Sequence, residues 1–283
     1  MDEVLGWCRG CGRTDDEIAE WADAGDSRRE AIWAALPERT GAMGIAITRL
    51  PWRRERIAEF VAESLDKKTG TWTVGCGDAV VEFSCAHNEP CRISVSGDTI
   101  TALSERGGLR MVVSEDARAL RLRADHACGG YRAIFLVVVK AKVNLPVVGA
   151  VTPLGRDEAA IRLEDRSEQW FDLGLGRADF RFAVRTADSE LRKRLNQASG
   201  LPLTGLMQSA GSMILSHRST RICETAIARA EVFSFKPLRG GNLTEGPHSC
   251  LSPGQLSVGR ATLLGIDLPP VYALGATFCP CRG

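Results

Sequence analysis

The spacing of apolar residues changes once along this chain, near residue 70, and that change limits the folds the chain can adopt. Upstream, apolar side chains recur every three or four positions, as Ile57, Val61 and Leu65 do, which is the repeat of one helix face. Downstream, from residue 71 to about 143, short runs rich in β-branched residues alternate as strands do. The pattern predicts an α+β fold.

Two units are expected from this change. The first, residues 1–66, is a short helical module. The second, residues 67–283, is a mainly antiparallel β-sheet or barrel with helices, and we expect the first unit to pack on it. A sub-boundary is placed near residue 150, where the strand-like alternation gives way to a mixture of elements.

Local signals indicate where several elements begin and end. Thr14 with Glu17 forms a capping-box pattern at the start of a helix. Pro37 is expected to close the second helix. Asp188 is expected to cap a later helix, whereas residues 168–176 have the composition of a loop.

Composition excludes some classes of protein. The chain has 44% hydrophobic and 25% charged residues, which is typical of a folded globular protein. Its formal net charge is only +1, so binding along nucleic acid is not expected. The longest apolar run, from Ala133 to Val139, is too short to cross a bilayer.

The N-terminal residues lack the basic and apolar segments of a secretory signal, which predicts a cytoplasmic protein, by default a bacterial one. Its ten cysteines are then expected to be mostly reduced thiols. Such thiols serve as small buried hydrophobes or as metal ligands more often than as a disulfide framework.

Cys8 and Cys11 are the strongest chemical signal in the chain. Their CxxC spacing lets one tight turn direct both sulfurs at a single metal ion, or join them as a redox pair. A structural zinc or an iron–sulfur cluster normally takes four protein ligands, so this pair supplies half of such a site.

The surrounding residues resemble a known family. The N-terminus is similar to a small Cys-rich proteobacterial domain of unknown function that is described as a predicted iron–sulfur protein. That resemblance covers about the first forty residues and implies an iron–sulfur cofactor. The residues that carry it are Cys8, Gly10, Cys11, Gly12, Arg13, Thr14, Glu17, Ile18, Trp21, Leu36, Pro37 and Arg39.

Other cysteines and histidines are candidates for the remaining ligands. Cys279 and Cys281 lie near the other end of the chain, and the ends of a domain are often close together. His248 and Cys250 form a second soft-donor pair in a Gly- and Pro-rich segment. His248 is also the preferred catalytic candidate, because an imidazole in such a segment has no packing role to explain it.

The rest of the chain loosely resembles an uncharacterised alphaproteobacterial family of unknown function, and the resemblance implies no reaction. It is carried by Trp72, Gly75, Glu82, Phe83, Phe171, Asp172, Gly174, Gly176, Val184, Arg185, Thr186, Glu245, Pro247 and His248.

Three functions follow from these patterns. The leading hypothesis is a metal-linked role, structural or sensory, in which Cys8 and Cys11 hold zinc or an iron–sulfur cluster. The second is an enzyme acting on small molecules with His248 as its acid–base or ligand residue. The third is a metal-free module that binds a partner through exposed Trp7 and Trp21. No specific substrate or partner is indicated.

Overall fold

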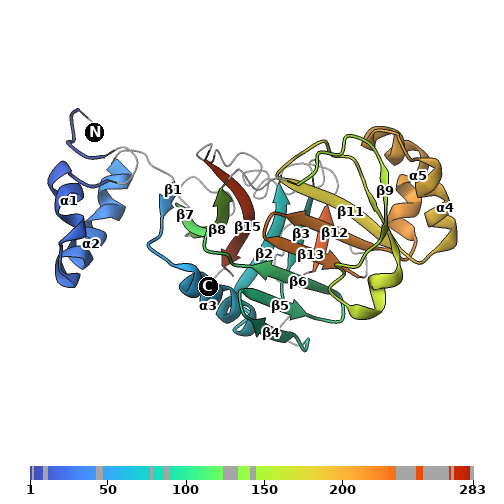
Figure 1. Ribbon diagram of the computed structural model, residues 1–283, viewed down its shortest axis with the longest axis horizontal. Coiled ribbons are helices and arrows are strands. Elements are labelled where there is room, and N and C mark those ends of the chain that lie inside the picture. The colour runs from blue at the N-terminus through green and yellow to red at the C-terminus, as the bar shows by residue number, and fades with distance from the viewer. Residues whose placement is uncertain are drawn as a thin grey trace.

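The computed structural model is an α+β protein, as predicted, built from two antiparallel sheets and a set of helices (Figure 1). It describes residues 1, 3–8, 12–42, 47–76, 79–85, 89–123, 133–140, 145–233, 247–250, 268 and 271–280. None of the helices within those ranges is long and apolar enough to span a membrane.

The N-terminal module consists of α1 (Asp15–Ala19), a 3₁₀ turn, η1 (Glu20–Ala22), and α2 (Asp26–Ala42). The predicted capping box is present: the Glu17 N–H donates to the Thr14 hydroxyl, and the Thr14 N–H donates to the Glu17 carboxylate. The prediction that Pro37 ends the second helix is wrong, because α2 continues to Ala42. The part of α2 after Pro37 includes Arg39, whose guanidinium lies 2.6 Å from the Glu17 carboxylate. A proline inside a helix costs free energy because it removes one backbone hydrogen bond, and this ion pair helps to offset that cost.

The first sheet has seven strands in the order β1-β7-β8-β15-β2-β3-β14, and every pairing is antiparallel. These strands come from distant parts of the sequence, so residues near both ends of the chain share one sheet. Their bounds are β1 (Ile47–Arg49), β2 (Gly70–Cys76), β3 (Ala79–Phe83), β7 (Arg118–Arg123), β8 (Ala133–Lys140), β14 (His248–Cys250) and β15 (Tyr272–Pro280).

The second sheet has eight antiparallel strands in the order β4-β5-β6-β13-β12-β11-β10-β9. The segment expected to be a loop at 168–176 instead contains β10, which pairs with a neighbour on each side. The bounds are β4 (Arg92–Ser96), β5 (Thr99–Leu103), β6 (Gly107–Val112), β9 (Thr152–Arg156), β10 (Gln169–Asp172), β11 (Phe180–Thr186), β12 (Thr220–Thr225) and β13 (Ala228–Val232).

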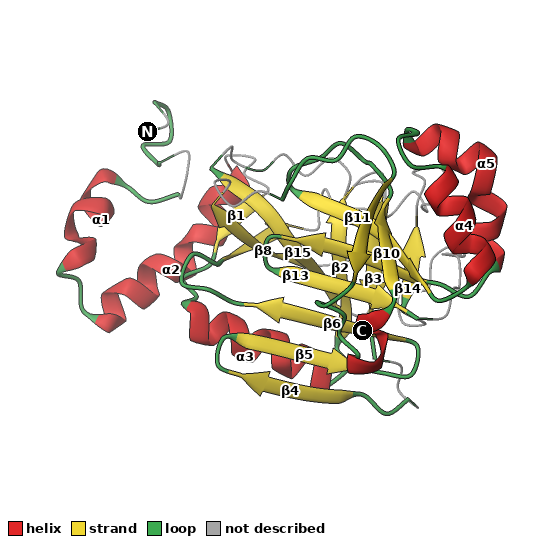
Figure 2. Cartoon of the chain, turned by 45° about the vertical axis from the view of Figure 1, so that its right-hand side comes forward, coloured by secondary structure: helices red, strands yellow, loops and turns green. Residues whose placement is uncertain are grey.

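The remaining helices are α3 (Arg54–Asp66), the 3₁₀ segment η2 (Leu163–Ser167), α4 (Ser189–Gln197) and α5 (Leu203–Ser216). Asp188 caps α4 as predicted, accepting from the N–H groups of Glu190 and Leu191. The helices α1 and α2 lie at one end of the molecule and α4 and α5 at the other (Figure 1 and Figure 2).

One hydrophobic core joins the two sheets and α3. Trp72 and Phe83 of the seven-stranded sheet belong to the same buried cluster as Phe171 and Phe182 of the eight-stranded sheet. Ile57, Val61 and Leu65 are the apolar face of α3, and all three are buried in this cluster. The chain before the predicted boundary at 66 therefore contributes a helix to the core of the part that follows it.

Candidate functional site

The thiol pair predicted at the N-terminus begins in a tight, hydrogen-bonded loop. The Cys8 N–H donates to the Arg13 carbonyl at 2.7 Å, and the Gly12 N–H donates to the Cys8 carbonyl at 2.8 Å. Gly12 has a φ of +77°, a conformation that a residue with a side chain rarely adopts. Cys8 is half-buried, and Cys11 lies outside the described residues.

Aromatic and charged side chains hold the rest of the module together. The Arg13 guanidinium lies over the Trp21 ring, 3.6 Å from its centroid, and Trp21 meets Trp33 edge to face at 5.9 Å. Trp7 and Trp21 were expected to be exposed and to form a partner-binding surface. Both are half-buried, so the area that they offer to a partner is smaller than expected.

Glu17 is the buried charge of this module. Burial by itself would raise the pKa of Glu17, but the Arg39 guanidinium and the Thr14 N–H outweigh that effect and hold it below its usual value.

Of the additional thiols proposed as ligands, Cys279 is the one whose side chain the structure describes. Cys279 is buried in β15, opposite Thr71 of β2, and Cys281 is outside the described residues. In both views α1 lies apart from β15 (Figure 1 and Figure 2). Among the residues that the structure describes, no group of three or more His, Cys, Asp or Glu side chains is arranged to hold a metal ion.

His248 lies in β14, beside a row of buried polar residues on the seven-stranded sheet. The strand register places His248 opposite Glu82, Glu82 opposite Thr73, and Thr73 opposite Thr277. Glu82, Thr73 and Thr277 are each at most 3% exposed. The Thr73 hydroxyl has no hydrogen-bond partner within the described part of the chain, which is uncommon for a buried polar group. Cys250 pairs with Val80 two positions along the same strand.

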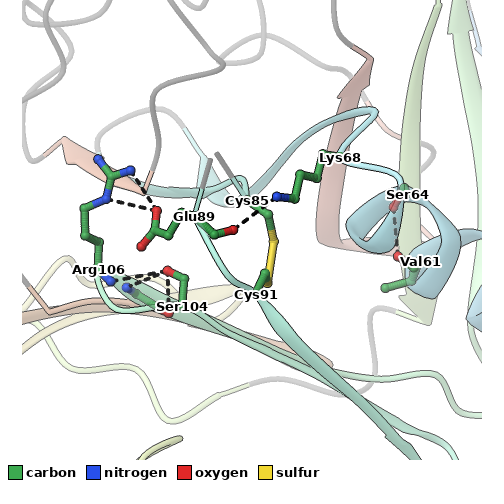
Figure 3. The surroundings of a disulfide bond; sticks show 9 residues. Val61, Ser64, Lys68, Cys85, Glu89, Cys91, Ser104 and Arg106 are labelled. Atoms are coloured by element: carbon green, nitrogen blue, oxygen red, sulfur yellow. Dashed lines mark hydrogen bonds and ion pairs between the residues drawn. A yellow bond between two sulfur atoms is a disulfide. The ribbon is translucent and has the colours of Figure 1, made fainter. Parts of the chain in front are cut away.

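Cys85 and Cys91 form a disulfide, with their Cα atoms 6.0 Å apart (Figure 3). This pair is an exception to the expectation that the thiols are mostly reduced. Glu89 lies between them in sequence; its carboxylate accepts from the Arg106 guanidinium, and its carbonyl accepts from the Lys68 ammonium. The disulfide joins Cys85, which follows β3, to Cys91, which precedes β4.

A buried ionic network on the eight-stranded sheet has no counterpart in the sequence analysis. The Arg185 guanidinium is fully buried and lies 2.6 Å from Asp157, 2.7 Å from Asp165 and 2.8 Å from Glu231. Arg229, also buried, contacts both Asp157 and Glu231. Asp157 and Asp165 belong to the segment after β9, so the network attaches that segment to β11 and β13.

The charges of this network set one another's ionisation. Burial alone would raise the pKa of Glu231, but Arg229 and Arg185 outweigh it and lower that pKa. Burial opposes the charged form of Arg185 too, yet Glu231 and Asp157 raise its pKa. In the sequence, the network could be seen only as two charged residues two positions apart, Arg229 and Glu231. A half-exposed strand would show the same spacing, because every second residue of a strand lies on the same face.

These features define a class of protein: a two-sheet α+β domain that carries an N-terminal helical thiol module. The chain belongs to the Family of unknown function (DUF6925), whose sequence profile it matches over residues 56–281. Residues 1–40 match a second profile, Protein of unknown function (DUF1289). Both predicted resemblances to families of unknown function are therefore confirmed. No curated protein and no solved structure matches the chain.

Proposed function

We propose that the N-terminal module binds a metal, as zinc or as an iron–sulfur cluster, with Cys8 and Cys11 as two of its ligands, and that this metal has a structural or sensory role. The observation that supports the proposal is the loop at Cys8. Two short backbone hydrogen bonds join Cys8 to the residues directly after Cys11, and a glycine with positive φ turns the chain there. A closed turn of this kind suits a pair of ligands on one ion.

Two thiolates provide half of a tetrahedral site. The other ligands would come from residues outside the described ranges or from a second molecule. When bound, the ion would link the loop to α1 and stabilise a module that has little core of its own.

Elemental analysis of untagged, anaerobically purified protein tests this proposal, with visible absorption to distinguish an iron–sulfur cluster from zinc. We expect the Cys8→Ser/Cys11→Ser variant to lose metal about tenfold. The matched control, Cys85→Ala/Cys91→Ala, also removes two cysteines and should retain the metal. Native protein without zinc or iron, or equal loss in the control, contradicts the proposal.

A second candidate function rests on the register of β14. The strand register places His248 opposite the buried Glu82. Directly opposite residues of an antiparallel pair share one face of the sheet, and a carboxylate close to an imidazole would favour its charged form. We propose His248 as the acid–base residue of an enzyme that acts on a small molecule.

Nuclear magnetic resonance titration tests this second proposal, because the chain has only four histidines. The His248 ring signals are identified with His248→Gln. Substituting Glu82→Gln should lower the pKa of His248, whereas Glu63→Gln, on the exposed face of α3, should leave it unchanged. An unchanged pKa in Glu82→Gln rejects the pairing.

A further inference from the structure

A depression lined by arginines lies where β1 ends and α3 begins, at the junction between the two family matches. The depression is open to solvent and has a volume of about 560 Å³. Arg49 lines it from the end of β1, Arg53 and Arg54 from the start of α3, and Arg118 from the start of β7. Figure 1 shows where these three elements lie. We refer to these four residues as the arginine depression. Residues 49–55 fall between the matched ranges 1–40 and 56–281.

The depression carries an excess of positive charge. Four arginines and two glutamates, Glu55 and Glu115, line it, which gives a formal charge of +2. Both carboxylates pair with Arg54, at N–O distances of 2.8 Å for Glu115 and 3.2 Å for Glu55. Among the described residues, no carboxylate forms an ion pair with the other three guanidinium groups of the depression.

Two of these guanidinium groups are available to a ligand. Among the described residues, neither the Arg49 nor the Arg53 guanidinium has a hydrogen-bond or ion-pair partner, and both residues are exposed. Arg118 is held in place by donating to the carbonyls of Glu115 and Ala117, at 2.6 and 2.7 Å. Part of the cluster is thus fixed, and part is free to close on an anion.

The start of α3 adds to the attraction for an anion. The cap residue, Arg53, makes no side-chain capping bond, and the first residues of this 13-residue helix line the depression. The positive end of the helix dipole lies there as well. One N–H group of the first turn is already engaged, because the Glu55 carboxylate accepts a hydrogen bond from its own backbone N–H; that bond, aided by Arg54, lowers the pKa of Glu55.

One side of the depression is an aromatic ring held in place by packing. Trp52 lines it, half-buried, and stacks on Phe135 of β8 with the rings 5.8 Å apart and 12° from parallel. A fixed wall beside the guanidinium groups reduces the ordering that a ligand must impose when it binds.

We propose that the arginine depression binds a small molecule that bears a diphosphate group. Guanidinium groups donate to phosphate oxygens in a fork geometry that matches them in pairs. A single phosphate would leave much of a space of about 560 Å³ unfilled. Two linked phosphates offer one phosphate to each of the two unpartnered guanidinium groups.

Isothermal titration of the full chain with inorganic pyrophosphate tests the proposal, with inorganic phosphate as the comparison. We expect one pyrophosphate per chain and weaker binding of phosphate. The Arg49→Gln/Arg53→Gln variant should bind pyrophosphate at least about tenfold more weakly.

Arg92→Gln/Arg156→Gln is the control, because it removes the same charge from two exposed residues, in β4 and β9, at the two ends of the other sheet's strand order. It should change the affinity by less than about twofold. Thermal melting by circular dichroism checks that both variants fold; if the Arg49/Arg53 variant does not, Arg53→Gln alone is titrated. Absence of pyrophosphate binding, equal affinity for phosphate, or equal loss in the control overturns the proposal.

Discussion

Replacing Arg185 with methionine tests the reasoning about the buried ionic network most directly. Methionine keeps much of the length of the side chain but removes the charge and the donors. Three carboxylates, each within 2.8 Å of the guanidinium in the native protein, then lose that partner inside the fold. One oxygen of Asp157 already has no hydrogen-bond partner among the described residues.

The expected loss follows from what remains. Removing one member of a buried ion pair costs about 3–5 kcal/mol, because the other charge stays buried without compensation. Arg229 still contacts Asp157 and Glu231, and Arg162 still contacts Asp165. We therefore expect a decrease in unfolding free energy of about 3 kcal/mol at pH 7, near the lower end of that range, rather than a sum over three contacts.

The effect should depend on pH in a defined direction. The lowered pKa of Glu231 means that its ionised form stabilises the fold at pH values above the unfolded pKa, near 4.5, and that this contribution is lost as the pH falls through the folded pKa. Without Arg185 the pKa of Glu231 rises. The difference between native and variant protein is therefore largest near neutrality and shrinks in acid, as the carboxylates become protonated.

Urea unfolding followed by circular dichroism, at pH 7 and at mildly acidic pH, measures both quantities. Arg56→Met is the control, because Arg56 is exposed and pairs with Glu59 and Glu63 at the surface; its cost should stay below about 0.5 kcal/mol. A loss of less than about 1 kcal/mol for Arg185→Met, or a difference that grows as the pH falls, would refute the reasoning.

Two further predictions concern the connections of the fold. The Cys85–Cys91 disulfide closes a short ring, so the Cys85→Ala/Cys91→Ala variant should lose about 2 kcal/mol of unfolding free energy; reductant should weaken the native protein but not the variant, and equal weakening would contradict the assignment. Gly174 has a φ of +75°, and a Cβ there would lie 2.4 Å from the backbone of Ala150. In thermal melts Gly174→Ala should therefore destabilise more than Gly97→Ala, where φ is +61° but the space is open; equal losses would show that the close contact has no effect.

The sequence was sufficient for features whose causes lie within a few residues. Thr14 with Glu17 and Asp188 with the first turn of α4 are caps formed by neighbours three positions apart or fewer. The apolar face of α3 and the change to alternation near residue 70 reflect the repeats of helix and strand themselves. These causes lie within a few residues of one another in the sequence, which is why the α+β class was predictable.

Tertiary structure decided what depends on distant partners. The segment of β10 was expected to be a loop, yet it pairs as a strand with both β9 and β11. Arg185 meets Asp157 across 28 positions and Glu231 across 46, and no local pattern encodes such a pairing. His248 was a candidate from composition, but only the register of β14 placed it opposite Glu82. A charge is tolerated inside a protein only when the fold brings an opposite charge to it, and that condition is met only when the chain has folded.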